Sequence, residues 1–315
     1  MRRAAETLRE WVESALRGEH TAAGMGVSCI VFLTGALTGT IIWLNGGTAF
    51  WVDLLFKQIG GPMLVAYAIV EMIAVSCVLQ WFAPGEPMRG PWRLLFAAGT
   101  THAVSMIFRH WLGEPIASNP LNVWPGAEAW MQVCREFGRV LGGTVYLGLL
   151  AAGLGAALRV HARLGLLRPP GAAGWAAFAA AGGLFAYTLR SLVYWLGVPG
   201  VRTSALWWLG WVTDPLLGLL LVLSMLLMRA SAPLAGGLLG RPWRSYFWAV
   251  LLTCIGSLCV GLGDAGLVPA LRLWPSWFVW HPAAALFALA PLWQLQAISE
   301  PLTAQRRAAR RNEAC

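Results

Sequence analysis

The stretch LGEPIASNPLNVWP, residues 112–125, has a counterpart in LGDAGLVPALRLWP, residues 262–275. The two align without a gap and share a Leu-Gly-acid start, an internal leucine and a Trp-Pro end. Each follows an apolar segment that opens with Pro-Trp-Arg, at residues 91–93 and 242–244. Repetition at this spacing predicts a chain built from two similar halves with the same order of elements.

The composition around these stretches is that of a membrane protein. Hydrophobic residues make up 58% of the 315 residues and charged residues 12%, about half the charged share of a soluble domain. The apolar runs are near the length of about 20 residues that a transmembrane helix needs, and they lack the alternation of a transmembrane barrel. The sequence predicts an all-α integral membrane protein with about eight transmembrane helices, four in each homologous half. The expected spans are 26–46, 61–83, 92–112, 137–158, 173–196, 208–228, 246–264 and 277–297.

Short polar segments divide the chain around these spans. We expect a first four-helix half over 26–158 and a second over 173–297, joined by a basic cytoplasmic linker at 159–172. Residues 1–20 place apolar side chains on one helical stripe and charges on the other, which predicts an amphipathic helix at the membrane surface. A docking site for a protein partner is the alternative for this helix. A basic cytoplasmic tail occupies 298–315.

The distribution of positive charge predicts the orientation of the chain. With both termini in the cytoplasm, most Lys and Arg residues fall in cytoplasmic segments, as the positive-inside rule requires. We therefore expect a multi-pass protein of the cell (inner) membrane with both termini cytoplasmic. The net charge of +9 follows from this topology and from attraction to anionic membrane lipid. No recognition motif or basic groove indicates nucleic acid as a partner.

Acidic side chains gather at the outer ends of the expected spans. Each half carries one acid near the start of its second helix and another at the end of its third. Polar groups that face the interior of a bundle mark pathways or reaction centres, so we expect a site there. Solvated surface ion pairs are the alternative. The candidate catalytic residues are Asp53, His110, Glu114, Asp214, Asp264 and His281.

Basic and aromatic residues on the same face are candidates for substrate binding. Arg135 and Arg139 are one helical turn apart and share a face, which suits a phosphate or carboxylate. A surface pair between Glu136 and Arg139 is the alternative. Tryptophans at this level are also typical of an aromatic belt at the membrane surface. The full set of candidate substrate-binding residues is Arg135, Arg139, Arg190, Trp124 and Trp274.

Two ionisable residues lie deep within the expected spans. Glu71 and His102 are each about ten residues into neighbouring antiparallel helices, which places them at a similar depth. An unpaired charge at that depth costs several kcal/mol, so we predict that the two side chains contact each other near the midplane. The corresponding residues of the second half are Val222 and Thr253. A structural pair without a functional role is the alternative.

The sequence names no cofactor. A bis-histidine haem needs two facing imidazoles at one depth, and His102 has no such counterpart in the expected spans. No His, Asp or Glu spacing within one expected helix matches a metal site.

These patterns support three functional interpretations. Acids and histidines beside arginine suit proton transfer at the head group of an amphipathic substrate, and tryptophan rings suit a lipid-like or isoprenoid tail. The leading interpretation is therefore a membrane enzyme or quinol-handling subunit that acts on a lipid-like small molecule. A transporter with Glu71 and His102 as its midplane element is the first alternative. A structural or assembly subunit of a larger membrane complex is the second.

Overall fold

A computed structural model of the chain describes residues 19–44, 58–114, 119–120, 126–167, 205–232, 239–264 and 278–313, with short pieces within 171–186 and residue 234. The predicted amphipathic segment falls almost entirely outside these residues, and so does much of the expected span 173–196. Near the ends of some helices the backbone is described without the side chains.

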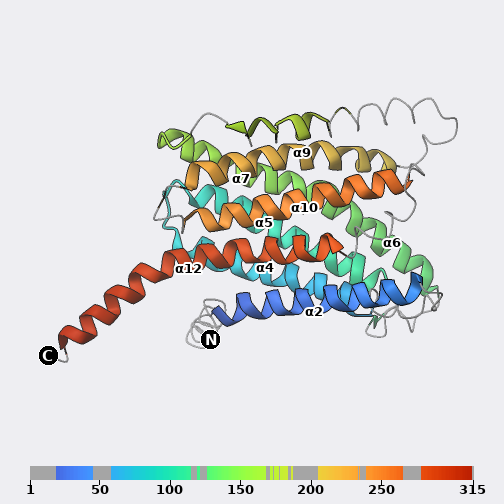
Figure 1. Cartoon of the computed structure of the whole chain (residues 1–315), viewed down its shortest axis with the longest axis horizontal. Helices are drawn as coiled ribbons and strands as arrows, with labels where there is room; N and C mark the ends of the chain where they lie inside the picture. Colours follow the sequence, from blue (N-terminus) through green and yellow to red (C-terminus); the bar gives the residue numbers. More distant parts are fainter. Residues whose placement is uncertain are drawn as a thin grey trace.

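The described part of the chain is all-helical, as the composition predicts (Figure 1). It contains eight α-helices and two π-helical segments, and the helices lie close to the expected spans. In chain order the elements are α2 (Glu19–Leu44), α4 (Gly61–Trp81), α5 (Arg89–Met106), η2 (Ile107–Leu112), α6 (Ala127–Val140), η4 (Leu141–Tyr146), α7 (Leu147–Arg163), α9 (Ala205–Ser231), α10 (Arg241–Asp264) and α12 (Trp280–Glu313).

Four helical stretches are long and apolar enough to cross a membrane: Gln58–Trp81, Ala127–Arg163, Val212–Ser231 and Arg241–Val260. A shorter apolar stretch, Ala23–Thr38, lies within α2. The chain is therefore a multi-pass membrane protein by the length and composition of its helices. The count of eight spans, the two homologous halves and the orientation stay predictions.

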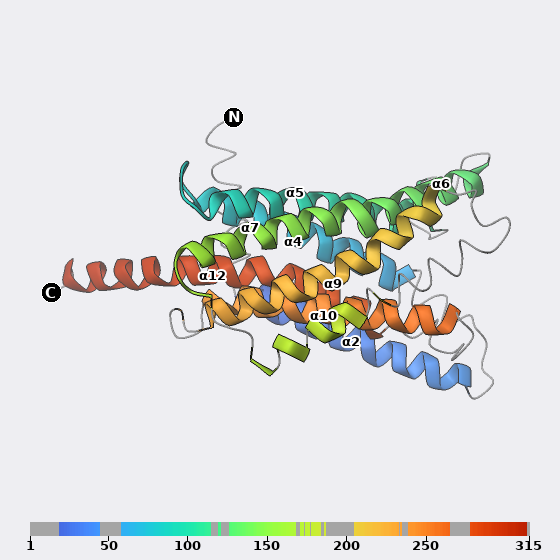
Figure 2. The ribbon, with the colours of Figure 1, turned by 90° about the horizontal axis from the view of Figure 1, so that it is seen from above.

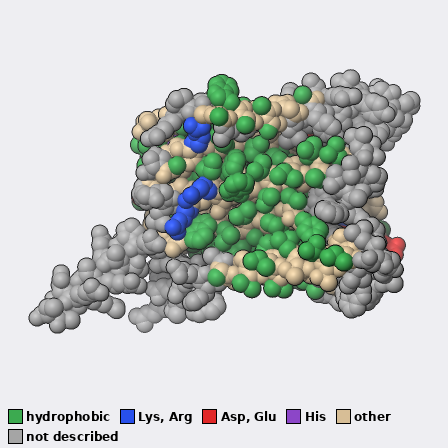
Figure 3. All heavy atoms as spheres, viewed as in Figure 1, with side chains coloured by type: hydrophobic (Ala, Val, Ile, Leu, Met, Phe, Trp, Pro, Cys, Tyr) green, Lys and Arg blue, Asp and Glu red, His purple; other side chains and the backbone are tan. Residues whose placement is uncertain are grey.

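The surface matches a lipid environment. Figure 3 shows hydrophobic side chains over the middle of one face, with Lys and Arg side chains toward one end of the bundle. Large apolar side chains on several helices are exposed, among them Ile30, Leu219 and Trp248. Such a band suits contact with lipid rather than with water.

Six helices close a ring. Its order is α4, α5, α7, α9, α10 and α12, and α12 packs back against α4. Figures 1 and 2 show these helices running side by side along the bundle. α2 lies outside the ring and packs against α12. The interior of the ring is therefore enclosed by helices from both halves of the sequence.

The two Pro-Trp-Arg motifs meet inside this ring. Trp92 is 0% exposed and Trp243 is 2% exposed, and their ring centroids are 6.1 Å apart. The following residues, Arg93 and Arg244, are exposed. The motif thus places its tryptophan in the core and its arginine on the surface. We call this end of the bundle, where α5 and α10 begin, the Pro-Trp-Arg end.

Two helices extend beyond the expected spans. α6 begins at Ala127 rather than at 137, and it continues through η4 into α7 as one helical stretch. α12 runs to Glu313, so the residues expected as a basic tail after 297 continue the helix. Ala, Gln, Arg and Glu, which make up much of that segment, favour helix. Figure 1 shows this part of α12 projecting from the bundle.

Glycine permits the close approach of α6 to the end of α5. A Cβ on Gly138 would lie 2.8 Å from the backbone nitrogen of Arg109 and 2.8 Å from the carbonyl oxygen of Ser105. Ser105 Oγ also donates a hydrogen bond of 2.8 Å to the Gly138 carbonyl. The helices therefore touch backbone to backbone at this point.

Gly138→Ala is expected to lower the free energy of unfolding by about 1–3 kcal/mol. The new methyl group would clash with backbone atoms, which cannot move aside as the end of a flexible side chain can. The matched control is Gly148→Ala in α7, where an added Cβ meets nothing within 4 Å. That variant is expected to be neutral or more stable by up to about 1 kcal/mol, because alanine favours helix. Reversible unfolding in mixed detergent micelles measures both changes. Equal effects of the two substitutions would contradict the close packing.

Candidate functional site

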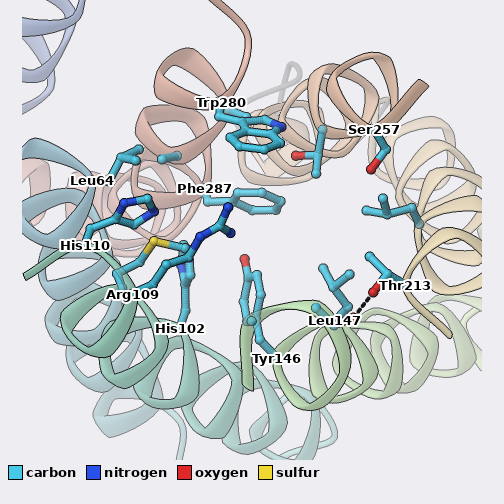
Figure 4. Close-up of a pocket in the computed structure, with 17 residues that line it drawn as sticks. Leu64, His102, Arg109, His110, Tyr146, Leu147, Thr213, Ser257, Trp280 and Phe287 are labelled. Carbon is cyan, nitrogen blue, oxygen red and sulfur yellow. Dashed lines mark hydrogen bonds between the residues drawn. The ribbon is translucent and has the colours of Figure 1, made fainter. Parts of the chain in front are cut away.

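A cavity of about 170 Å³ lies inside the ring (Figure 4). All six ring helices contribute to its wall, which is apolar over Leu64, Leu147 and Phe287 among others. An apolar cavity of about 150 Å³ holds a molecule the size of benzene, so this one suits a small ring or head group. Its polar and ionisable side chains are His102, Arg109, His110, Tyr146, Thr213, Thr253 and Ser257.

The predicted contact between Glu71 and His102 is confirmed. His102 Nδ1 and Glu71 Oε2 are hydrogen-bonded at 2.6 Å, and the two side chains are 5% and 2% exposed. Gly99 of α5 lies against Met72 of α4, where an added Cβ would be 3.4 Å from the Met72 Cα, an ordinary packing distance. His102 lines the cavity, and the bond to Glu71 fixes its orientation.

An aromatic cluster continues from this pair toward the Pro-Trp-Arg end. The rings of His102 and Tyr146 are stacked, with centroids 4.3 Å apart and planes 9° apart. Phe287 meets the edges of both rings at 6.2 and 5.9 Å. The cluster then continues through Tyr246 to Trp243, with centroid separations of 6.2 and 6.1 Å. These buried rings fill the interior of the bundle on that side of the cavity.

Arg109 is the cation of the cavity wall. It comes from η2, and its guanidinium carbon lies 5.4 Å from the centroid of the Trp280 ring, a cation–π distance. Figure 4 shows the guanidinium directed into the cavity. No carboxylate of the described residues forms an ion pair with it.

Hydroxyl groups complete the polar lining. The Tyr146 hydroxyl is buried and has no hydrogen-bond partner within the described residues, and Figure 4 shows it pointing into the cavity. Ser257 likewise makes no hydrogen bond with the described part of the chain. Thr213 Oγ1, by contrast, donates to the Gly143 carbonyl at 3.0 Å. Two hydroxyl groups are thus left for a bound molecule.

The π-helical segments shape this site. η2 carries Arg109 and His110, and η4 carries Tyr146. A π turn inserts an extra residue and releases a backbone carbonyl from the helix, and such turns are frequent at functional sites. The carbonyl of Gly143 in η4 accepts from Thr213, as described above. Widening of two neighbouring helices therefore makes room for the cavity.

The structure brings His110 of the predicted site residues to the cavity wall. Glu114 lies beyond η2 and pairs with Arg135 at 3.3 Å. Arg135 also donates two hydrogen bonds to the Gly113 carbonyl, at 2.8 and 3.2 Å. Carbonyls at a helix end need such donors, so the contacts of Arg135 stabilise the end of η2.

Other predicted residues lie away from the cavity. Arg139 is exposed and lies 3.5 Å from Glu136, which is the surface pair expected as the alternative. His281 is buried, donates to the Gly60 carbonyl at 3.0 Å and stacks on Phe32 with centroids 3.9 Å apart. Asp214 follows the lining residue Thr213 in the sequence but does not line the cavity itself.

Five predicted site residues have no described side chain. Asp53, Trp124, Arg190 and Trp274 lie outside the described residues, and Asp264 ends α10 without a described side chain. Their assignment to the site stays a prediction.

Five polar lining residues were not among the predicted site residues: Arg109, Tyr146, Thr213, Thr253 and Ser257. Arg109 could have been predicted from the sequence, because it is a charged residue inside an expected span and such residues are usually functional. The other four belong to residue types that are common in membrane helices, and no feature of the sequence marks them as lining residues.

No group of three or more His, Cys, Asp or Glu side chains among the described residues is arranged to hold a metal ion. No protein-family model matches the chain, and no curated protein or solved structure is significantly similar to it. The functional argument therefore rests on the geometry of the cavity.

Proposed function

We propose that this protein binds the head group of an amphipathic, lipid-like molecule in the ring cavity and exchanges a proton with it. The observation that carries the proposal is the position of His102. One ring nitrogen is bonded to the buried carboxylate of Glu71, while the ring forms part of the cavity wall. A carboxylate that orients an imidazole toward a substrate site is the arrangement of a general acid and base.

The proton-transfer step follows from this arrangement. His102 Nε2 takes the proton of an acidic or hydroxyl group of the head group, so that the ligand O–H bond breaks and an N–H bond forms. Glu71 stabilises the imidazolium that results. The negative charge left on the ligand oxygen is stabilised by Arg109, which lines the same cavity. The reverse transfer returns the proton.

The remaining lining favours an apolar body or tail. Leu64, Met106, Leu147 and Leu217 come from four different elements and face the cavity. Apolar surroundings of this kind strengthen the electrostatic interactions of the polar groups beside them. A lipid-like or isoprenoid molecule with one polar end matches these surroundings.

Ala284→Phe is expected to weaken ligand binding at least about tenfold, because the new ring occupies a cavity that is scarcely larger than a ring. Ala284 lines the cavity. The matched control is Ala152→Phe, on an exposed position of α7. Calorimetric titration of the purified full chain in lipid nanodiscs with dodecyl phosphate and with dodecanol measures the change. Unchanged binding of both probes to a folded Ala284→Phe variant would refute the cavity as the site.

A second variant tests the proton transfer separately. His102→Gln keeps a hydrogen-bonding group beside Glu71 but cannot exchange a proton. The heat of binding of dodecyl phosphate is measured in buffers of different ionisation enthalpy, because that heat depends on the buffer when a proton moves. The wild type is expected to show the dependence, and His102→Gln is expected to bind without it. Buffer dependence that survives in His102→Gln would exclude His102 as the proton acceptor.

A proton-coupled transporter is the second candidate. It is favoured by the position of the cavity and of the Glu71–His102 pair between the helices of the ring, since carriers place their sites within the membrane. Reconstituted vesicles distinguish the two functions. Movement of dodecyl phosphate across the membrane together with protons would support transport, and binding without movement would support the first proposal.

A further inference from the structure

We propose that the head group held in this cavity is an anion, a phosphate or a carboxylate, and that the Arg109 guanidinium binds it. The inference rests on the proposed function and names the chemical class of its ligand. Three observations carry it: the charge balance around Arg109, the surroundings of its guanidinium and the hydroxyl groups opposite.

The charge balance leaves Arg109 without a neutralising acid. Two other arginines lie nearby on α6, and each has its own carboxylate: Arg135 with Glu114 at 3.3 Å and Arg139 with Glu136 at 3.5 Å. Within the described residues, no third carboxylate pairs with Arg109. Arg109 is therefore the cation of the cavity wall that has no paired carboxylate among the described residues.

The surroundings of Arg109 favour an added anion. It lies within an expected span, where an unpaired guanidinium is unfavourable. The face of Trp280, 5.4 Å away, compensates part of that cost through its cation–π attraction. An oxyanion in the cavity would offset the rest of the cost of the unpaired guanidinium through charge-assisted hydrogen bonds. Arginine forms such bonds in pairs to phosphate or carboxylate.

Hydroxyl groups from two other ring helices supply further donors. Tyr146 is only 4% exposed, its hydroxyl has no partner within the described residues, and it points into the cavity (Figure 4). Buried hydroxyls are normally satisfied, so this one is available to a bound molecule. Ser257 is similarly without a hydrogen bond in the part of the chain that the structure describes. An oxyanion accepts hydrogen bonds from all three groups, whereas a cationic head group would be repelled by the Arg109 guanidinium, which only donates.

The experiment compares probes that differ only in head group. The purified full chain in lipid nanodiscs is titrated with dodecyl phosphate, with dodecanol and with inorganic phosphate. Arg109→Gln removes the cation while keeping a polar side chain. The matched control is Arg93→Gln, which makes the same charge change at an exposed position of α5, the helix that η2 continues. Arg109→Lys serves as the second variant, because it keeps the charge and loses the paired donors.

The wild type and Arg93→Gln are expected to bind dodecyl phosphate at least about tenfold more tightly than dodecanol. Arg109→Gln is expected to bring the two affinities together, and Arg109→Lys to keep an intermediate preference. Equal binding of both amphiphiles by the wild type would overturn the anion inference and leave the proposed function standing. Failure of both amphiphiles to bind would overturn both. Inorganic phosphate that binds as tightly as dodecyl phosphate would support the anion site and overturn the lipid-like part of the proposed function.

Discussion

Glu71→Leu is expected to lower the free energy of unfolding by about 3–5 kcal/mol, the loss that follows when one partner of a buried polar pair is removed. His102 then remains at 4% exposure with no acceptor in place of the carboxylate that lies 2.6 Å from it. Reversible unfolding in mixed detergent micelles measures the loss. Neither water nor lipid hydrocarbon replaces the missing partner, which is why the effect is large.

Two further variants test whether the loss of stability comes from the interaction between Glu71 and His102. The double variant Glu71→Leu with His102→Leu is expected to recover most of the loss, because no unpaired polar group is left behind. Glu136→Gln, which weakens the exposed pair with Arg139, is expected to cost less than about 1 kcal/mol. A double variant as unstable as the sum of both single variants would show that the two side chains act independently.

Trp243→Ala is expected to lower the free energy of unfolding by about 3–5 kcal/mol, because it opens a large cavity in the core. Trp243 is 2% exposed and contacts the rings of Trp92, Tyr246 and His161. The change therefore removes the centre of the packing at the Pro-Trp-Arg end. Unfolding in mixed micelles measures it as before.

The same helix supplies a control of the same residue type. Trp248 is 52% exposed, and Trp248→Ala is expected to change the stability by less than about 1 kcal/mol. Trp92→Ala combined with Trp243→Ala should cost less than the sum of the two, because the two cavities merge. Equal losses for Trp243→Ala and Trp248→Ala would contradict the burial of the Pro-Trp-Arg tryptophans.

Much of the fold was predictable because a membrane helix can be recognised in a sequence from its length and its apolar composition. The Glu71–His102 contact was predictable for a related reason. Each residue of a helix adds the same rise, so equal distances from the ends of neighbouring antiparallel helices correspond to equal depth. The end of α12 was missed, because apolarity identifies the span and says little about how far the helix continues beyond it.

The site was harder to predict because its residues are oriented by irregular turns. Arg109 and His110 lie within η2, where the extra residue of a π turn changes which side chains face inward. A period of 3.6 residues assumes a regular helix and does not reveal this rotation. His281 was predicted for the site, but its neighbour Trp280 lines the cavity instead, because adjacent helical residues point in different directions. The tryptophans of the Pro-Trp-Arg motifs, too, are core residues, unlike those of an aromatic belt.

Closure of the ring also sets an order of events during biosynthesis. The hydrogen bond from His281 to Gly60 joins residues 221 positions apart, and α12 is the final helix of the ring in chain order. Contacts between distant parts of a chain form only after the intervening chain is available. Until α12 is synthesised, the ring stays open between α10 and α4, the two helices that α12 joins. The cavity therefore has its complete wall only once α12 is in place, because Trp280, Ala284 and Phe287 of that helix line it.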